Sequence, residues 1–109
     1  MKINIKATKI ELTETIKSYV QRKMNMLEKY LGKVPVTNCD VEVGKEVGGQ
    51  NSGKIYRAEA NLSVPGQVLR VVKTEKDLYK AIDKVKDHLS QSIKKYKEKK
   101  VDRKRTINK

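Results

Sequence analysis

Residues 74–100 read TEKDLYKAIDKVKDHLSQSIKKYKEKK, and their apolar side chains recur with the period of an α-helix. The intervals between them are four, three, four, four and three residues, for Leu78, Ile82, Val85, Leu89, Ile93 and Tyr96. This spacing places them on one side of a helix that packs on a core. Thr74 and Asp77 form a Ser/Thr-x-x-acid pattern, which predicts that the helix begins at Thr74 as its N-cap and extends to about Lys100.

Lysine side chains crowd the rest of this predicted helix. One line of polar side chains keeps helical spacing and is expected to lie along a single flank: Lys80, Lys84, His88, Gln91, Lys95 and Lys99. Like charges at such spacings destabilise an isolated helix by about 0.2–0.5 kcal/mol per pair. A helix that keeps them is therefore expected to face a polyanion rather than only solvent.

The chain has 109 residues and a formal net charge of +13, which indicates one small domain with a basic surface. Residues 94–109 carry nine Lys and Arg side chains against two acidic ones, so the positive charge is concentrated near one end. Nucleic acid is the leading partner for such a distribution, and an anionic membrane surface comes second. The chain lacks the Trp and Phe anchors of interfacial helices, which disfavours the membrane.

Other functional classes find little support in the sequence. Cys39 is the only cysteine, so no intrachain disulfide or cysteine metal site is expected, and we predict that it is a small buried apolar residue. His88 is the only histidine, and the chain has neither a nucleophile elbow nor a phosphate-binding glycine loop ahead of a helix. No apolar run is long enough to span a bilayer, and residues 1–12 do not resemble a signal peptide. We predict a cytoplasmic protein that is not an enzyme and has no cofactor, metal or small-molecule substrate.

The remaining chain alternates between strand and helix patterns. Strands are predicted where apolar side chains occupy every second position, around residues 3–7, 39–43, 56–64 and 69–71. A first helix is predicted to begin after the N-cap Thr13 and to end at Gly32, which would adopt a positive φ. Pro65 and Gly66 fit the centre of a type II turn, and residues 44–54 are predicted to form a glycine-rich loop.

The resulting order, β-α-β-β-β-α, predicts an α+β fold. The first strand, the helix and the second strand fit a crossover between parallel neighbours, and antiparallel hairpins follow. Two roughly parallel helices are expected on one face of a four-stranded sheet. Residues 1–100 would form this domain, and residues 101–109 would form a basic, disordered tail.

Two stretches carry a resemblance to a known family. The first begins with IELT at residues 10–13 and leads to RKMNMLEKY at residues 22–30. The second is DLYKAID at residues 77–83, followed by KKYK at residues 94–97. Together with the element order, these stretches make roughly residues 1–100 resemble the ribosome hibernation promoting factors, also called ribosome-associated inhibitor, sigma-54 modulation or S30AE proteins.

The resemblance implies a fold related to double-stranded RNA-binding domains and a translation silencer that occupies the mRNA and tRNA channel of the small ribosomal subunit. Such proteins support ribosome hibernation in stressed or stationary cells. Their partners are the small subunit and its rRNA, and an isolated domain is expected to be monomeric. The positions that face rRNA in the family fall here on Lys23, Lys29, Lys95, Lys97 and Lys99. Arg22 and Lys84 join this set by their charge and their place on the helices.

The chain also departs from the family pattern. Many relatives have Arg at the position of Gln91, so one phosphate contact is expected to be missing. The glycine-rich loop and the hairpin at residues 64–68 match no signature of the family. The sequence stops where longer relatives continue into a dimerising second domain, so a short form or the N-terminal domain of a long form is expected.

Two other functions stay open on composition alone. One is a general basic RNA- or DNA-binding module without ribosome specificity, and the other is a protein-interaction domain whose basic face meets an acidic partner. The five tyrosines are interpreted as packing residues rather than as platforms for bases. Tyr79 is predicted to hydrogen-bond across to the sheet or the first helix, and Asp83 is predicted to pair with a nearby lysine.

Overall fold

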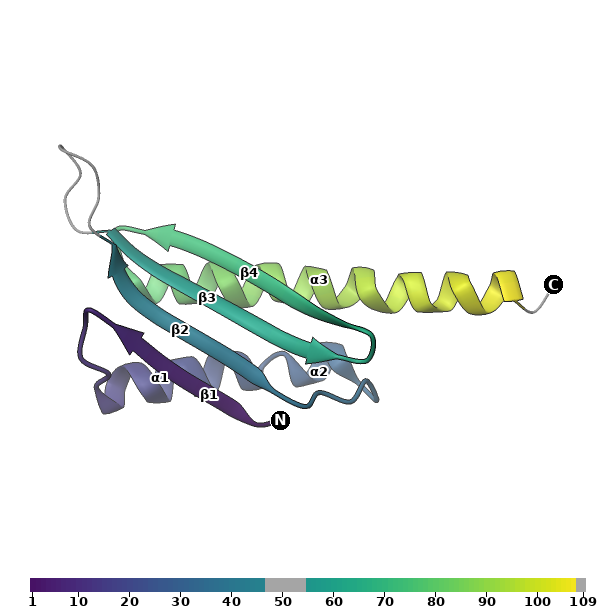
Figure 1. Ribbon diagram of the computed structural model, residues 1–109, viewed down its shortest axis with the longest axis horizontal. Coiled ribbons are helices and arrows are strands. Elements are labelled where there is room, and N and C mark those ends of the chain that lie inside the picture. Colours follow the sequence, from purple (N-terminus) through teal and green to yellow (C-terminus); the bar gives the residue numbers. More distant parts are fainter. Residues whose placement is uncertain (47–54, 108–109) are drawn as a thin grey trace.

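The computed structural model describes the backbone of residues 1–46 and 55–107 and the side chains of these residues up to residue 100. Four strands form one sheet in the order β1 (Ile3–Thr8), β2 (Cys39–Glu46), β3 (Ile55–Val64) and β4 (Gln67–Glu75). β1 and β2 are parallel, and the other neighbours are antiparallel. Figure 1 shows the helices α1 (Glu14–Asn25), α2 (Glu28–Leu31) and α3 (Leu78–Ile107) on one face of this sheet, with α1 and α3 running in the same direction. The predicted α+β fold and element order are confirmed.

The core lies between the helices and the sheet. Every apolar residue of the predicted α3 stripe, from Leu78 to Tyr96, is at most 7% exposed. The alternating residues of β2 and β3 bury their side chains against this stripe, as at Val43 and Leu62. Cys39 is buried as predicted, and this burial raises the pKa of its thiol to about 12, so the thiol is kept in its unreactive protonated form.

The first helix begins as predicted and ends in two steps. The Thr13 hydroxyl accepts a hydrogen bond from the amide of Ile16, which satisfies one of the free N–H groups of the first turn. The chain then tightens, since the amide of Leu27 bonds to the carbonyl of Met24, and one short turn, α2, follows. Gly32 closes it with φ +58, the positive value expected.

The predicted start of α3 at Thr74 is wrong. Thr74 lies in β4, where it pairs with Arg57 of β3, and the helix begins at Leu78. The carboxylate of Asp77 accepts the amide of Tyr79, and the carbonyl of Asp77 accepts the amide of Ala81. Asp77 is therefore the N-cap, because strand pairing with β3 holds Thr74 in an extended conformation.

The predicted end of α3 near Lys100 is also too early, since helical backbone continues to Ile107. The division of the chain into a domain of residues 1–100 and a tail of residues 101–109 stays a prediction. Gly66 has φ +86, as the Pro65-Gly66 turn requires. The predicted glycine-rich loop coincides largely with residues 47–54, which lie outside the described residues, whereas Gly44 belongs to β2.

Candidate nucleic-acid interface

The packing of α1 against α3 creates a polar seam that is centred on Asp83. The hydroxyl of Tyr19 on α1 donates a hydrogen bond to the Asp83 carboxylate at 2.6 Å, and the ammonium of Lys23 lies 3.1 Å from the same oxygen. Partial burial of Asp83 opposes ionisation, but the hydrogen bonds from Tyr19 and Lys23 outweigh it and hold the pKa of Asp83 below its usual value. The predicted pairing of Asp83 with a lysine is confirmed.

Aromatic and cationic side chains surround this seam at Tyr19. The ring of Tyr79 on α3 meets the Tyr19 ring edge to face, with 4.8 Å between the centroids and 80° between the planes. Arg22 and Lys23 lie 5.2 and 5.3 Å from the Tyr19 centroid, within the range of cation–π attraction. The prediction of a hydrogen bond from the Tyr79 side chain is not borne out among the described residues. Its ring contacts Tyr19, and the hydroxyl of Tyr19 makes the hydrogen bond between α1 and α3.

A second cluster lies further along the seam at Tyr30 on α2. The ammonium groups of Lys29 and Lys94 each lie 5.1 Å from the Tyr30 centroid. The ammonium of Lys97 donates a hydrogen bond to the Tyr30 carbonyl at 3.0 Å, which links α3 to α2. Three cations from two helices therefore converge on one partly buried tyrosine.

The seven predicted RNA-binding residues do not form one continuous set. Arg22, Lys23, Lys29 and Lys97 lie along the seam. Lys84 forms an ion pair with Glu75 at the end of β4, at 3.1 Å. Lys95 and Lys99 follow Lys84 with helical spacing and are exposed, so these three lie on the flank of α3 that faces β4. The structure thus divides the predicted site between two flanks of α3.

Lys94 is a member of the seam that sequence reasoning missed. Its contact with Tyr30 cannot be recognised from local spacing, because the two residues are remote in sequence. Its spacing of three residues from Lys97 was the available signal, since such residues share one face of a helix.

The interpretation of the tyrosines as packing residues is confirmed for Tyr96 in the core and for Tyr19, Tyr30 and Tyr56, which are partly buried against it. Tyr96 is 5% exposed, and its hydroxyl donates a hydrogen bond to the Pro65 carbonyl at 2.7 Å. Tyr56 packs against the core from β3. Tyr79 differs from them, because it is 36% exposed.

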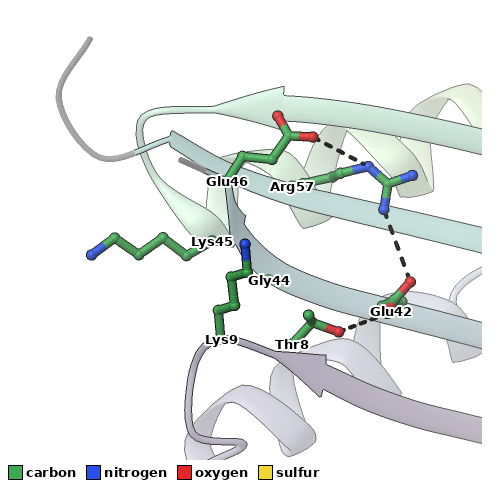
Figure 2. A pocket seen from close by; sticks show the side chains of 7 residues that line it. All are labelled: Thr8, Lys9, Glu42, Gly44, Lys45, Glu46 and Arg57. Carbon is green, nitrogen blue, oxygen red and sulfur yellow. Dashed lines mark hydrogen bonds and ion pairs between the residues drawn. The ribbon is translucent and has the colours of Figure 1, made fainter. Parts of the chain in front are cut away.

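The face of the sheet opposite the helices carries acidic and basic side chains that pair with one another. The Glu59 carboxylate accepts hydrogen bonds from Arg57 at 2.6 Å, from Asn61 at 3.0 Å and from Arg70 at 3.2 Å. Figure 2 shows Arg57 lying between Glu46 and Glu42, at 3.8 and 3.9 Å, while Thr8 donates a hydrogen bond to Glu42 at 2.7 Å. The charges of this face are largely balanced, so it contributes little to the net positive charge.

Two other kinds of site, a membrane span and a metal centre, can be checked in the described residues. Among them, no helix has the length and apolarity needed to cross a membrane. Within the same part of the chain, no group of three or more His, Cys, Asp or Glu side chains is arranged to hold a metal ion.

Comparison with known proteins agrees with this fold. The chain is 32% identical over 88 residues to a ribosome hibernation promotion factor of Deinococcus radiodurans, a match that covers 81% of this chain and 44% of that protein. It is also 32% identical over 99 residues to a ribosome hibernation promoting factor of Pseudomonas putida, covering 91% of this chain and 89% of the relative. The chain thus spans about half the length of some curated relatives and most of the length of others.

Solved structures show the same arrangement. The N-terminal domain of Thermus thermophilus Protein Y superposes with a TM-score of 0.69 at 29% identity, over 88% of this chain and 99% of that one. A ribosomal subunit interface protein from Coxiella burnetii superposes with a TM-score of 0.70 at 16% identity, over 89% of this chain and 98% of that one, which supports the fold alone. The model of the Sigma 54 modulation protein / S30EA ribosomal protein family matches residues 3–101. The chain therefore belongs to the Sigma 54 modulation protein / S30EA ribosomal protein family.

Proposed function

We propose that this protein binds the small ribosomal subunit through its helical face and silences translation during ribosome hibernation. The observation that carries this proposal is the one-sided charge of the fold. Cations gather along α1, α2 and α3, whereas the opposite face of the sheet neutralises its own charges. Relatives that are named hibernation factors support the ribosome as the source of the polyanion.

The chemistry of the face suits an RNA backbone. Lysine and arginine side chains bind phosphates and release condensed counterions, so affinity falls steeply as salt rises. An A-form RNA surface is recognised mainly by its shape and its phosphates, and a lysine-rich face needs no base-specific hydrogen bonds for this. The proposed phosphate contacts are Arg22, Lys23, Lys29, Lys84, Lys95, Lys97 and Lys99, to which the structure adds Lys94.

These cations differ in the ion pairs that they form in the free protein. Lys23 and Lys84 already pair with Asp83 and Glu75, so a phosphate has to compete with a carboxylate for each of them. Lys95 and Lys99 are exposed. We expect the exposed lysines to make the larger contribution to binding, because no ion pair with Asp83 or Glu75 has to be broken.

Silencing in this proposal is steric. A domain seated in the channel for mRNA and tRNA excludes both of them, and no bond is made or broken. Inhibition should therefore be reversible and stoichiometric, with one monomeric domain for each small subunit.

Co-sedimentation with separated ribosomal subunits tests the proposal. We expect stoichiometric binding to the small subunit at moderate salt that an excess of a short RNA duplex does not displace. Inclusion of mRNA and initiator tRNA should reduce binding, since the proposed site overlaps theirs. If an excess of the duplex displaces the protein from the small subunit, the protein would be a general RNA- or DNA-binding module. This result would overturn the ribosome-specific function.

A further inference from the structure

An open hollow lies at the end of the molecule where α1 and α3 begin. Its volume is about 490 Å³, and apolar and aromatic side chains line it, among them Ile10, Ile16, Tyr56 and Tyr79, together with Lys76. This volume lies within the range of about 300–1,000 Å³ that is typical of sites for small organic groups. The hollow can therefore receive a flat group of the size of a nucleobase.

The ring of Tyr79 is the feature of this hollow that favours a flat, aromatic ligand. Tyr79 is 36% exposed, and its edge-to-face contact with Tyr19 leaves part of its surface free to line the hollow. A partly exposed aromatic ring that lines a hollow offers a flat apolar surface on which another ring can pack. Since every nucleobase has a π-face, a base can cover such a ring by stacking.

The hollow adjoins the polar seam between α1 and α3, because Tyr79 lines the hollow and its ring contacts Tyr19 in the seam. Arg22 lies 5.2 Å from the Tyr19 ring, and Lys76 lines the hollow itself. Proteins bind unpaired nucleotides with aromatic rings that lie beside cations. The base stacks on the ring, and the cations bind the phosphates. Asp77, which also lines the hollow, already accepts a hydrogen bond from the amide of Tyr79 as the cap of α3.

We propose that an unpaired nucleobase of ribosomal RNA docks in this hollow against Tyr79, while Lys76 and Arg22 contact the adjoining phosphates. This inference rests on the proposed function, which supplies the RNA. It adds a source of specificity, because the bases of a duplex are stacked inside the helix and cannot enter the hollow. Backbone contacts alone would bind any A-form duplex.

The test compares affinities for the small subunit among variants with matched exposure. Tyr79→Ala removes the ring, Tyr79→Phe keeps the ring and removes the hydroxyl, and Val72→Ala shortens a side chain that is 37% exposed on the opposite face of the sheet. We expect Tyr79→Ala to raise Kd between about five-fold and about 150-fold, as loss of one base–aromatic stack does. Tyr79→Phe and Val72→Ala should bind like the wild type.

Chemical probing of unpaired rRNA bases separates stacking from a structural role of Tyr79. The wild type and Tyr79→Phe should protect at least one unpaired base that Tyr79→Ala leaves reactive. Unchanged affinity of Tyr79→Ala, equal losses for Tyr79→Ala and Tyr79→Phe, or weaker binding with unchanged base protection would each overturn the inference. The last result would point to an apolar protein side chain in the hollow or to a loosened seam.

A single-stranded oligonucleotide that contains 2-aminopurine keeps the inference testable if the wild type fails to bind the small subunit. Quenching of its fluorescence by the wild type and by Tyr79→Phe, but not by Tyr79→Ala, would support base docking although the proposed function had failed. Absence of quenching by the wild type would overturn base docking as well.

Discussion

The hydroxyl of Tyr19 on α1 donates a hydrogen bond to the carboxylate of Asp83 on α3 at 2.6 Å, and this contact joins two residues that are 64 positions apart in the sequence. Lys23 pairs with the same carboxylate oxygen at 3.1 Å. The three side chains link the two helices through polar contacts, in addition to the apolar core that packs both helices on the sheet.

The first prediction concerns the free energy of unfolding. Tyr19→Phe removes one hydrogen bond to a carboxylate that Lys23 still pairs with, and we expect a loss of about 1 kcal/mol in urea denaturation at neutral pH. Tyr79→Phe is the matched control, since the Tyr79 hydroxyl makes no hydrogen bond to any residue whose side chain the structure describes. Equal stabilities of Tyr19→Phe and Tyr79→Phe would contradict the role assigned to this contact.

The second prediction concerns the ionisation of Tyr19. The hydrogen bond to Asp83, with burial and the Asp83 charge as further causes, raises the pKa of the Tyr19 phenol from 10.0 to about 12. Since the folded value lies above the unfolded one, the stabilisation is complete below pH 10 and is lost as the pH rises through about 12. Ultraviolet difference absorbance should show the late titration of Tyr19 in the wild type and a shift of this titration toward pH 10 in Asp83→Asn. A late titration that persists in Asp83→Asn would show that Asp83 is not its cause.

The third prediction concerns Glu59 on the open face of the sheet. Hydrogen bonds from Asn61, Arg57 and Arg70 outweigh partial burial and lower the pKa of Glu59 from 4.5 to about 2. The stabilisation is therefore present above about pH 4.5 and is lost as the pH falls through about 2. Glu59→Gln should cost about 1–2 kcal/mol at pH 7 and progressively less in acid, as followed by urea denaturation across this range. A cost that does not change with pH would contradict this account.

The fourth prediction concerns Gly44, at the point where β2 approaches the end of β1. A Cβ atom at Gly44 would lie 2.7 Å from the carbonyl oxygen of Thr8, so the two backbones would have to separate. We expect Gly44→Ala to lower the stability by about 1–3 kcal/mol in thermal or urea denaturation. At Gly66 no atom lies within 4 Å of an added Cβ, so Gly66→Ala tests backbone strain without a clash and should cost only about 1 kcal/mol. A smaller effect at Gly44 than at Gly66 would argue against the close approach of β1 and β2.

Local sequence patterns predicted most of this fold correctly. The intervals from Leu78 to Tyr96 and the alternation in β2 and β3 each follow the geometry of a single element, so they can be recognised without knowledge of neighbours. The start of α3 was mistaken because Thr74 and Asp77 both fit an N-cap. Pairing of Thr74 with Arg57 of β3, which is remote in sequence, decides between them.

The candidate site was harder to predict for the same reason. The lysines were visible in the sequence, but the side chains that hold them come from other elements: Asp83 for Lys23, Glu75 for Lys84 and Tyr30 for Lys94. Whether Lys97 faces the seam or the β4 flank depends on how α3 is rotated against the sheet. That rotation is set by the packing of the whole core.

The most direct test of the account compares two double charge reversals that change the net charge by the same amount. Lys95→Glu with Lys97→Glu changes both flanks of α3, whereas Lys2→Glu with Lys6→Glu makes the same change in charge near β1, away from the helices. We predict that the first pair raises Kd for the small subunit at least about ten-fold and reduces the salt dependence of log Kd, because two phosphate contacts are lost. The second pair should change Kd little, and the two double variants should remain folded. Equal effects of the two pairs would show that only net charge matters and would contradict a specific ribosome-binding face on the helices.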